Sequence, residues 1–100
     1  MRIPRRVRIC GQVFDVKMQD EILVGNGKRK EKLLGLCDTQ STRILLKRGM
    51  SNEKKKEVFL HECIHAIEVN LDLGLSEQKV NLLGVEMLSF LKDSRLDFNK

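Results

Sequence analysis

A histidine pair with a glutamate beside it is the feature of this 100-residue chain best suited to chemistry. His61, Glu62 and His65 form the pattern H-E-x-x-H. On a helix, residues four apart are rotated by about 400°, so both imidazoles can reach one zinc ion. Glu62 lies on the neighbouring flank, where it can take a proton from a zinc-bound water with a pKa of about 7. The spacing therefore predicts Zn²⁺ as cofactor, His61 and His65 as ligands, and Glu62 as general base.

The alternative interpretation is that the two histidines only pack or face solvent, because three fixed positions can match by chance. The surrounding residues argue against it. Apolar residues recur at helical spacing on one side of the motif, and further apolar residues lie on the other side. Such a helix should be mostly buried, and buried ionisable groups need a partner or a metal. The first set comprises Leu60, Ile64, Ile67 and Leu71, and the second Val58, Phe59, Ala66 and Val69.

A third metal ligand is needed, because catalytic zinc usually has three protein ligands. The chain has no further histidine, so the ligand should be a carboxylate. Glu77 is the leading candidate, since it opens the next predicted helix after a loop long enough for the chain to fold back; the alternative is that it only interacts with the helix dipole. Glu68 is the rival, as a ligand or as a group supporting one. Asp72 and Glu86 are weaker options.

Length and composition fit one domain over residues 1–100. The chain is 41% hydrophobic but has no tryptophan or tyrosine, so its core must be aliphatic. No apolar run approaches the roughly 18 residues of a membrane span, and no secretory signal follows the basic N-terminus. We therefore expect a cytoplasmic protein with no membrane partner.

The cysteines and the net charge add two expectations. Cys10, Cys37 and Cys63 form no C-x-x-C pair, which indicates reduced thiols; Cys63, on the far side of the helix from His65, should fill the core. The net charge of +5 permits nucleic-acid binding. However, the basic residues are scattered and there is no aromatic platform for bases, so nucleic acid is a less favoured partner. Solubility, or attraction of an acidic partner, explains the charge at least as well.

Two hairpins are predicted in the first half of the chain. Alternating residues indicate strands at Val7–Ile9 and Phe14–Met18, with Gly11 at the first central position of a tight turn and Phe14, Val16 and Met18 facing the core. A second pair of strands is expected at 33–37 and 43–47. The apolar segment 22–24 ends at a turn signal, and the charged run 27–32, which lacks a phosphate-loop pattern, should be a solvated loop.

Two helices are predicted in the second half. Ser51 should cap a helix from about Asn52 to Leu71, which breaks near Gly74, and Ser76 should cap another from Glu77 to about Lys92. Gly84 would allow the helices to approach closely, and residues 93–100 should form a loose tail. The fold class is α+β, with a small antiparallel sheet of two hairpins packed on two helices. The expected buried face of the second helix comprises Val80, Leu83, Met87 and Leu91, widened by Leu82, Val85, Leu88 and Phe90.

This order of elements resembles the minimal gluzincin-type zinc metallopeptidases, and within them the small phage and mobile-element proteins related to the ImmA/IrrE group. The resemblance covers about residues 33–92. It implies a zincin-like fold, with His61, His65 and Glu77 as zinc ligands and Glu62 as base. It also implies that a peptide substrate adds as a strand beside 43–47 at the sheet edge. The matching segments are Leu34–Asp38, Ile44–Leu46, Leu60–Ile67 and Leu75–Leu83.

The chain departs from this family in two respects. Residues 77–84 match the E-x-x-A-N-x-F-A pattern of the second helix only loosely, and no tyrosine or spare histidine is present to stabilise an oxyanion. Zinc itself, or Arg43, would have to take that role. The expected function is zinc-dependent hydrolysis of a peptide bond in a specific protein substrate. The alternatives are a catalytically weak or inactive zinc-binding module that interacts with a regulatory protein, and a nucleic-acid-binding protein.

Overall fold

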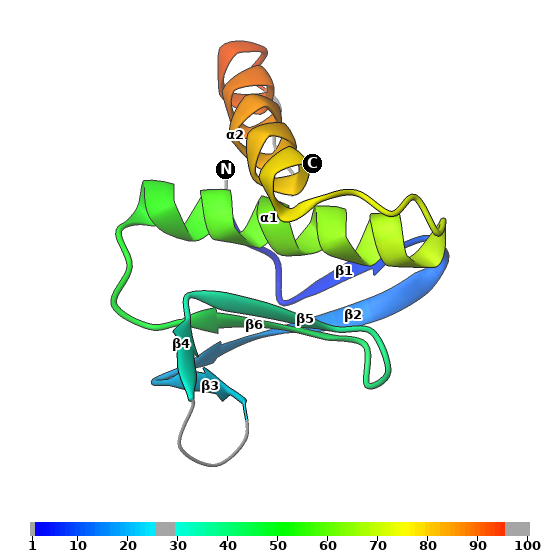
Figure 1. Ribbon diagram of the computed structural model, residues 1–100. Coiled ribbons are helices and arrows are strands. Elements are labelled where there is room, and N and C mark those ends of the chain that lie inside the picture. The colour runs from blue at the N-terminus through cyan, green and yellow to red at the C-terminus, as the bar shows by residue number, and fades with distance from the viewer. Residues whose placement is uncertain (1, 26–29, 96–100) are drawn as a thin grey trace.

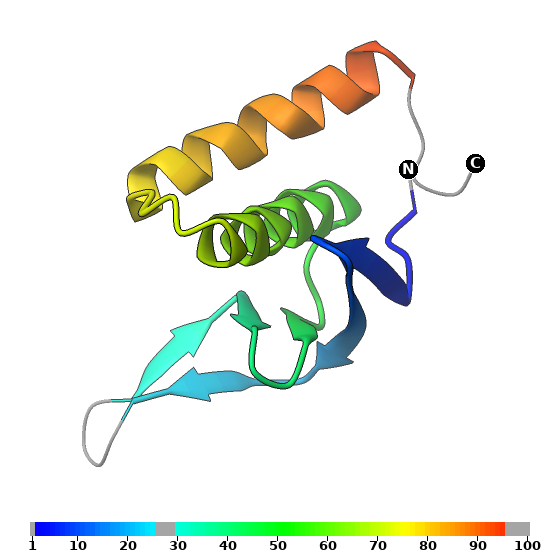
Figure 2. The same ribbon diagram turned by 90° about the vertical axis from the view of Figure 1, so that its right-hand side faces the viewer.

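The computed structural model describes residues 2–25 and 30–95, and these form six strands and two helices. They are arranged in layers: helix α1 (Asn52–Asn70) lies across one face of the main sheet, and helix α2 (Glu77–Asp93) lies on the opposite side of α1 (Figures 1 and 2). The prediction that the helix carrying the histidine pair is mostly buried is confirmed for the middle of the helix, whereas Val69 and Leu71 at its end are exposed. The buried residues of α1 are Val58, Phe59, Leu60, Glu62, Ile64 and Ala66.

The main sheet is mixed, in the order β1-β2-β6-β5. The two predicted hairpins are confirmed, because β1 (Arg6–Ile9) pairs antiparallel with β2 (Gln12–Gln19), and β5 (Gly35–Asp38) with β6 (Arg43–Lys47). The strand expected at 33–37 begins only at Gly35, and Leu33 belongs to another strand. However, β2 and β6 run parallel at the centre of the sheet, so the prediction of an antiparallel sheet is wrong. Parallel pairing joins strands that are distant in sequence, and hydrophobic alternation says nothing about the direction in which they meet.

The turn between β1 and β2 has Cys10 and Gly11 at its centre, since Ile9 lies opposite Gln12. Both central residues have positive φ angles, 49° and 79°. This is the mirrored turn that suits the twist of a two-residue hairpin. Gly11 thus takes the second central position rather than the predicted first.

A second, two-stranded sheet projects from the main sheet on the side away from the helices (Figure 1). It pairs β3 (Ile22–Val24) with β4 (Glu31–Leu33). The first two residues of β4 lie in the charged run 27–32, which was predicted as a loop. The prediction missed this strand because an exposed strand of this kind carries no apolar alternation. Residues 26–29 of that predicted loop lie outside the described residues.

Both helix starts are confirmed with their caps. The Ser51 hydroxyl accepts a hydrogen bond from the backbone N–H of Lys54, and the Ser76 hydroxyl accepts one from Lys79, each at 3.2 Å. The first helix ends within one residue of the prediction, and the connection to α2 passes through Gly74, whose φ is 62°. The second helix extends to Asp93, where the loose tail was expected to begin, and residues 96–100 of that tail lie outside the described residues.

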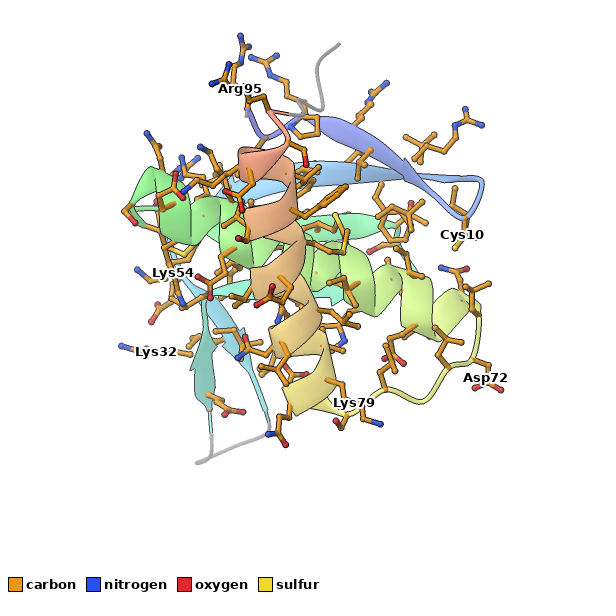
Figure 3. The ribbon with its side chains drawn as sticks, turned by 90° about the horizontal axis from the view of Figure 1, so that it is seen from above. Cys10, Lys32, Lys54, Asp72, Lys79 and Arg95 are labelled. Atoms are coloured by element: carbon orange, nitrogen blue, oxygen red, sulfur yellow. The ribbon has the colours of Figure 1, made fainter. Side chains whose placement is uncertain are left out.

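The buried face of α2 differs from the predicted one. Its buried residues are four apart and include Gly84. Figure 3 shows that α2 crosses the middle of α1. A Cβ atom built on Gly84 would lie 3.6 Å from the Cα of His61, so the predicted close approach is confirmed. The buried residues are Val80, Gly84 and Leu88. Exposed apolar residues are Leu82, Leu83, Val85, Met87 and Phe90.

The core lies between the sheet and α1. Phe14 is fully buried there, and Val16 and Met18 pack against it, as predicted for alternate residues of β2. Within residues 2–25 and 30–95, neither helix combines the length and apolar character needed to cross a bilayer. The buried members of the core cluster are Ile9, Phe14, Ile44, Leu46, Val58, Phe59 and Ala66.

Candidate metal centre

The structure brings together His61, His65 and Glu77. The Nε2 atoms of the two histidines are 3.1 Å apart. One carboxylate oxygen of Glu77 lies 2.7 Å from Nε2 of His61, and the other lies 2.9 Å from Nε2 of His65. These three side chains are the one group of potential metal ligands of this kind found among the described residues. Asp72 and Glu86 do not belong to it.

Helix geometry and the α1–α2 connection account for this convergence. The four-residue spacing puts both imidazoles on the side of α1 that faces the start of α2. The connecting loop is held by Glu68, whose backbone carbonyl accepts the N–H of Leu73 and whose side chain accepts the N–H of Leu75. Ser76 then caps α2, so Glu77 begins the helix directly beside the histidine pair.

The donor atoms lie at separations near those of zinc ligands. With Zn–N and Zn–O distances of about 2.0–2.1 Å, neighbouring ligands of a tetrahedral site are about 3.3 Å apart. The three separations here, 2.7, 2.9 and 3.1 Å, are slightly shorter than this. The histidine side chains are largely covered, with 16% and 24% exposure, whereas that of Glu77 is 71% exposed. The cluster is thus covered by protein on the side of the histidines and open to solvent on the side of Glu77.

The contacts of this cluster can be made in two ways. An ionised carboxylate only accepts hydrogen bonds, so each histidine would need a proton on Nε2 to donate to its own oxygen of Glu77. The two N–H groups would then lie side by side, with their nitrogens 3.1 Å apart. A divalent cation in place of the two protons would be attracted to both nitrogen lone pairs and to the carboxylate. The donor set is therefore suited to a metal ion.

Glu68 supports the cluster from outside it. One of its oxygens lies 3.7 Å from Nδ1 of His65, which is longer than a hydrogen bond, while the other accepts the Leu75 N–H at 3.3 Å. Carboxylates near the non-ligating nitrogen commonly orient metal-binding histidines. Of the two roles considered for Glu68, the geometry favours that of a supporting group.

Glu62 is buried beside the histidine pair, with 7% of its surface exposed. Burial raises the pKa of its carboxyl group to about 7; the nearby His65 opposes this and the Glu77 charge adds to it. The backbone N–H of Cys37, on β5, donates a hydrogen bond to the carboxylate. Glu62 is therefore held between α1 and β5, with a pKa suited to exchanging protons near neutral pH.

This raised pKa predicts a pH-dependent stability of the metal-free protein. The ordinary pKa is 4.5 and the folded value is about 7, so between these values the folded protein binds more protons at Glu62 than the unfolded chain does. The free energy of unfolding should then fall as pH rises across this range, by roughly 3 kcal/mol from this group. Urea unfolding in the presence of a chelator measures it. Glu62→Gln should remove most of the slope, and an unchanged slope would contradict the assignment.

Gly35 on β5 makes the close approach to α1 possible. A Cβ atom at this position would lie 2.5 Å from Cγ1 of Val58 and 3.1 Å from Oε2 of Glu62. The apolar pattern of residues 33–37 predicts only that Gly35 belongs to a strand, so this role was missed. A glycine in an apolar strand is the signal that could have revealed it, because it often marks close backbone approach.

Replacing Gly35 should therefore be costly. Gly35→Ala is expected to lower the free energy of unfolding by about 1–3 kcal/mol, because a methyl group overpacks the contact with Val58. Gly84→Ala is the matched control: its Cβ meets His61 at an ordinary 3.6 Å, and alanine favours a helix by up to about 1 kcal/mol. Denaturant titration compares the two variants. Equal effects would contradict the packing role of Gly35.

The strand at the sheet edge next to the cluster is β5, not the predicted 43–47. Residues 43–47 form β6, which has β2 on one side and β5 on the other. The N–H of Lys47 donates a hydrogen bond to the carbonyl of Leu34. In an antiparallel pair, successive residues direct their backbone N–H and C=O groups alternately towards and away from the partner strand. Gly35 and Cys37 therefore direct theirs away from β6. The exposed edge that faces the cluster is therefore that of β5.

Arg43 is not brought to the cluster. Its guanidinium group contacts the Asp38 carboxylate at 3.5 Å and the Ser41 hydroxyl at 3.1 Å, at the turn of the β5–β6 hairpin. The predicted role of Arg43 in stabilising an oxyanion is therefore not supported. Hydrogen bonds within the Asp38–Ser41 turn explain its position.

The cysteines are free thiols outside the cluster. Cys63 packs against the core, as predicted. Burial raises the pKa of Cys37 and of Cys63 to about 12, which keeps both thiols protonated at neutral pH. Neither side chain is suited to bind a metal in this state, since the thiolate is the ligand form.

Two hollows meet at the cluster. One, of about 580 Å³, runs along β5 past Leu36 and Val69, and the other, of about 260 Å³, runs towards Lys54 and Asn81. His61, Glu62 and Glu77 line both. An extended chain could therefore pass the cluster on both sides.

Comparison of the sequence with protein-family models and curated proteins, and of the structure with solved structures, gives no match.

Proposed function

We propose that this protein is a zinc-dependent metallopeptidase that hydrolyses a peptide bond in a protein substrate. The observation that carries the proposal is the convergence of His61, His65 and Glu77, with the buried Glu62 beside them. The proposed class is the minimal gluzincin-type metallopeptidase related to the ImmA/IrrE group, with a zincin-like fold. The proposed substrate is a specific protein.

His61, His65 and Glu77 would hold the ion between α1 and α2. Bound zinc supplies Lewis acidity, which polarises a carbonyl group and lowers the pKa of a water molecule to about 7. Glu62 would take the proton of the attacking water and deliver it to the leaving amine, roles that suit its pKa of about 7. The hydrogen bond from Cys37 fixes the orientation of the carboxylate.

The substrate would bind as an additional strand along β5. Gly35 offers backbone groups that point away from β6, and the two hollows flank the cluster. A chain antiparallel to β5 would run from the side of Leu36 and Val69 towards that of Lys54 and Asn81. Main-chain hydrogen bonds of this kind hold a peptide extended while side-chain pockets select it.

The proposal is tested with zinc-loaded protein and a proteome-derived peptide library, followed by mass spectrometry of new termini. Cleavage at defined positions should occur, and should stop with a chelator and in Glu62→Gln. Absence of cleavage by protein with bound zinc, across peptide and intact-protein substrates, would overturn it.

One observation favours a second function, that of a zinc-binding interaction module without catalysis. The chain has no tyrosine, and Arg43 is occupied at the hairpin turn. Such a module would keep its partner binding in Glu62→Gln but would lose it, together with folding, in His61→Ala. The peptidase keeps zinc but loses product formation in the first variant.

A further inference from the structure

A separate cavity of about 390 Å³ lies where the N-terminal segment passes the first turns of α1. None of its lining residues belongs to the hollows around the candidate metal centre. Its volume is within the range of binding sites. Residues 2–5, one face of β2 and the start of α1 form its walls. The cavity is therefore separate from the candidate metal centre.

The cavity is strongly cationic. Arg2, Arg5, Lys55 and Lys56 line it, and none of the other described residues that line it carries a carboxylate. Among the described residues, only Lys56 of these four has an ion-pair partner, Glu53 at 3.4 Å. That carboxylate also binds a lysine of α2 at 2.9 Å, so one negative charge is shared by two lysines. Within residues 2–25 and 30–95, the positive charges of the cavity are thus largely uncompensated.

The start of α1 adds to this potential. Asn52, the first residue of the helix, lines the cavity. The N-terminal end of a helix carries partial positive charge from backbone N–H groups that have no partner within the helix. An anion in the cavity would therefore be attracted by side chains and by the helix together.

The floor of the cavity is apolar and aliphatic. Ile3 and Pro4 contribute to it from the N-terminal segment, and Val16 and Met18 from β2. All four are half-buried. No aromatic residue is among the described residues of its lining, so these offer no surface on which a nucleobase could stack. The matching ligand combines anionic groups with aliphatic side chains.

We propose that this cavity binds an acidic segment of a partner protein, in which aspartate or glutamate residues alternate with aliphatic ones. The carboxylates would pair with Arg2, Arg5 and Lys55, since arginine binds carboxylates through two parallel hydrogen bonds. The aliphatic side chains would lie on Val16 and Met18. The proposal does not depend on the metallopeptidase function, because binding here involves neither the metal centre nor cleavage.

Fluorescence anisotropy with a labelled peptide of alternating glutamate and leucine tests the proposal. Lys55→Glu should weaken binding about tenfold, because it reverses one of the pairing charges. The change should not impair folding, since an acidic residue is favourable in the first turns of a helix. Lys17→Glu is the matched control: Lys17 is exposed between Val16 and Met18 on β2, and its side chain points to the opposite face. It should change the affinity by less than about threefold.

Further comparisons separate the alternatives. Replacing leucine by serine in the peptide should weaken binding several-fold, and a lysine–leucine peptide should not bind. An equal loss in Lys17→Glu and Lys55→Glu would overturn the proposal in favour of nonspecific attraction. No effect of the serine replacement, with displacement by inorganic phosphate or by a single-stranded oligonucleotide, would overturn it in favour of a phosphate site.

Discussion

Glu62→Gln is expected to lower the rate of peptide cleavage by at least about 100-fold, the lower end of what a positioned general base contributes. Glutamine keeps the size and the hydrogen-bond acceptor that Cys37 uses, but it cannot take a proton. Zinc affinity should stay close to the original value, since Glu62 does not belong to the ligand group. Rates from mass spectrometry and zinc content from native mass spectrometry measure the two effects.

Glu86→Gln is the control for this experiment. Glu86 is exposed on α2 and lies outside the ligand group, so its replacement should leave cleavage and zinc content unchanged. Substantial cleavage by Glu62→Gln would remove Glu62 as the base. Loss of zinc from the same variant would instead indicate that Glu62 holds the ion.

The second large effect concerns the third ligand. Glu77→Gln is expected to weaken zinc binding by more than about 100-fold, which exceeds the roughly 10–100-fold loss typical of a group that only supports a ligand. Its carboxylate approaches both histidine nitrogens, at 2.7 and 2.9 Å. Competition with a chromophoric chelator gives the affinities.

Glu68→Gln is the comparison that distinguishes the two carboxylates. Glu68 is closest to His65 at Nδ1, the nitrogen that faces away from the cluster, so its replacement should cost no more than about 100-fold. A larger loss in Glu68→Gln than in Glu77→Gln would exchange the roles of the two residues. Equal and negligible losses would show that the ion is held without either.

The helices and their ends could be predicted because the signals are local. Ser51 and Ser76 precede apolar runs with helical spacing, and each hydroxyl caps its helix. His61 and His65 share a side of α1 by geometry alone, and Glu77 follows a loop that lets the chain return. The grouping of the candidate site was thus predictable from spacing, whereas the bound ion and the activity remain proposals.

Long-range features could not be predicted in the same way. The parallel pairing of β2 and β6 depends on contacts between distant segments. The resemblance to a known family implied that 43–47 lies at the sheet edge, which β5 occupies instead. The buried face of α2 was misjudged because the helix is apolar on several sides, so periodicity fits more than one face. Gly84, at the centre of the true face, contributes nothing to a hydrophobic pattern.

The way α2 rests on α1 links the metal to the integrity of the molecule. One end of α2 is tied by Lys92 to Glu53 at 2.9 Å, and the other end meets the histidines through Glu77. An ion bound there would hold the start of α2 against α1. The free energy of metal binding would then include the free energy of packing α2 on α1. Removal of the ion would then loosen the contact of α2, a helix with exposed apolar residues, and would also remove the proposed activity.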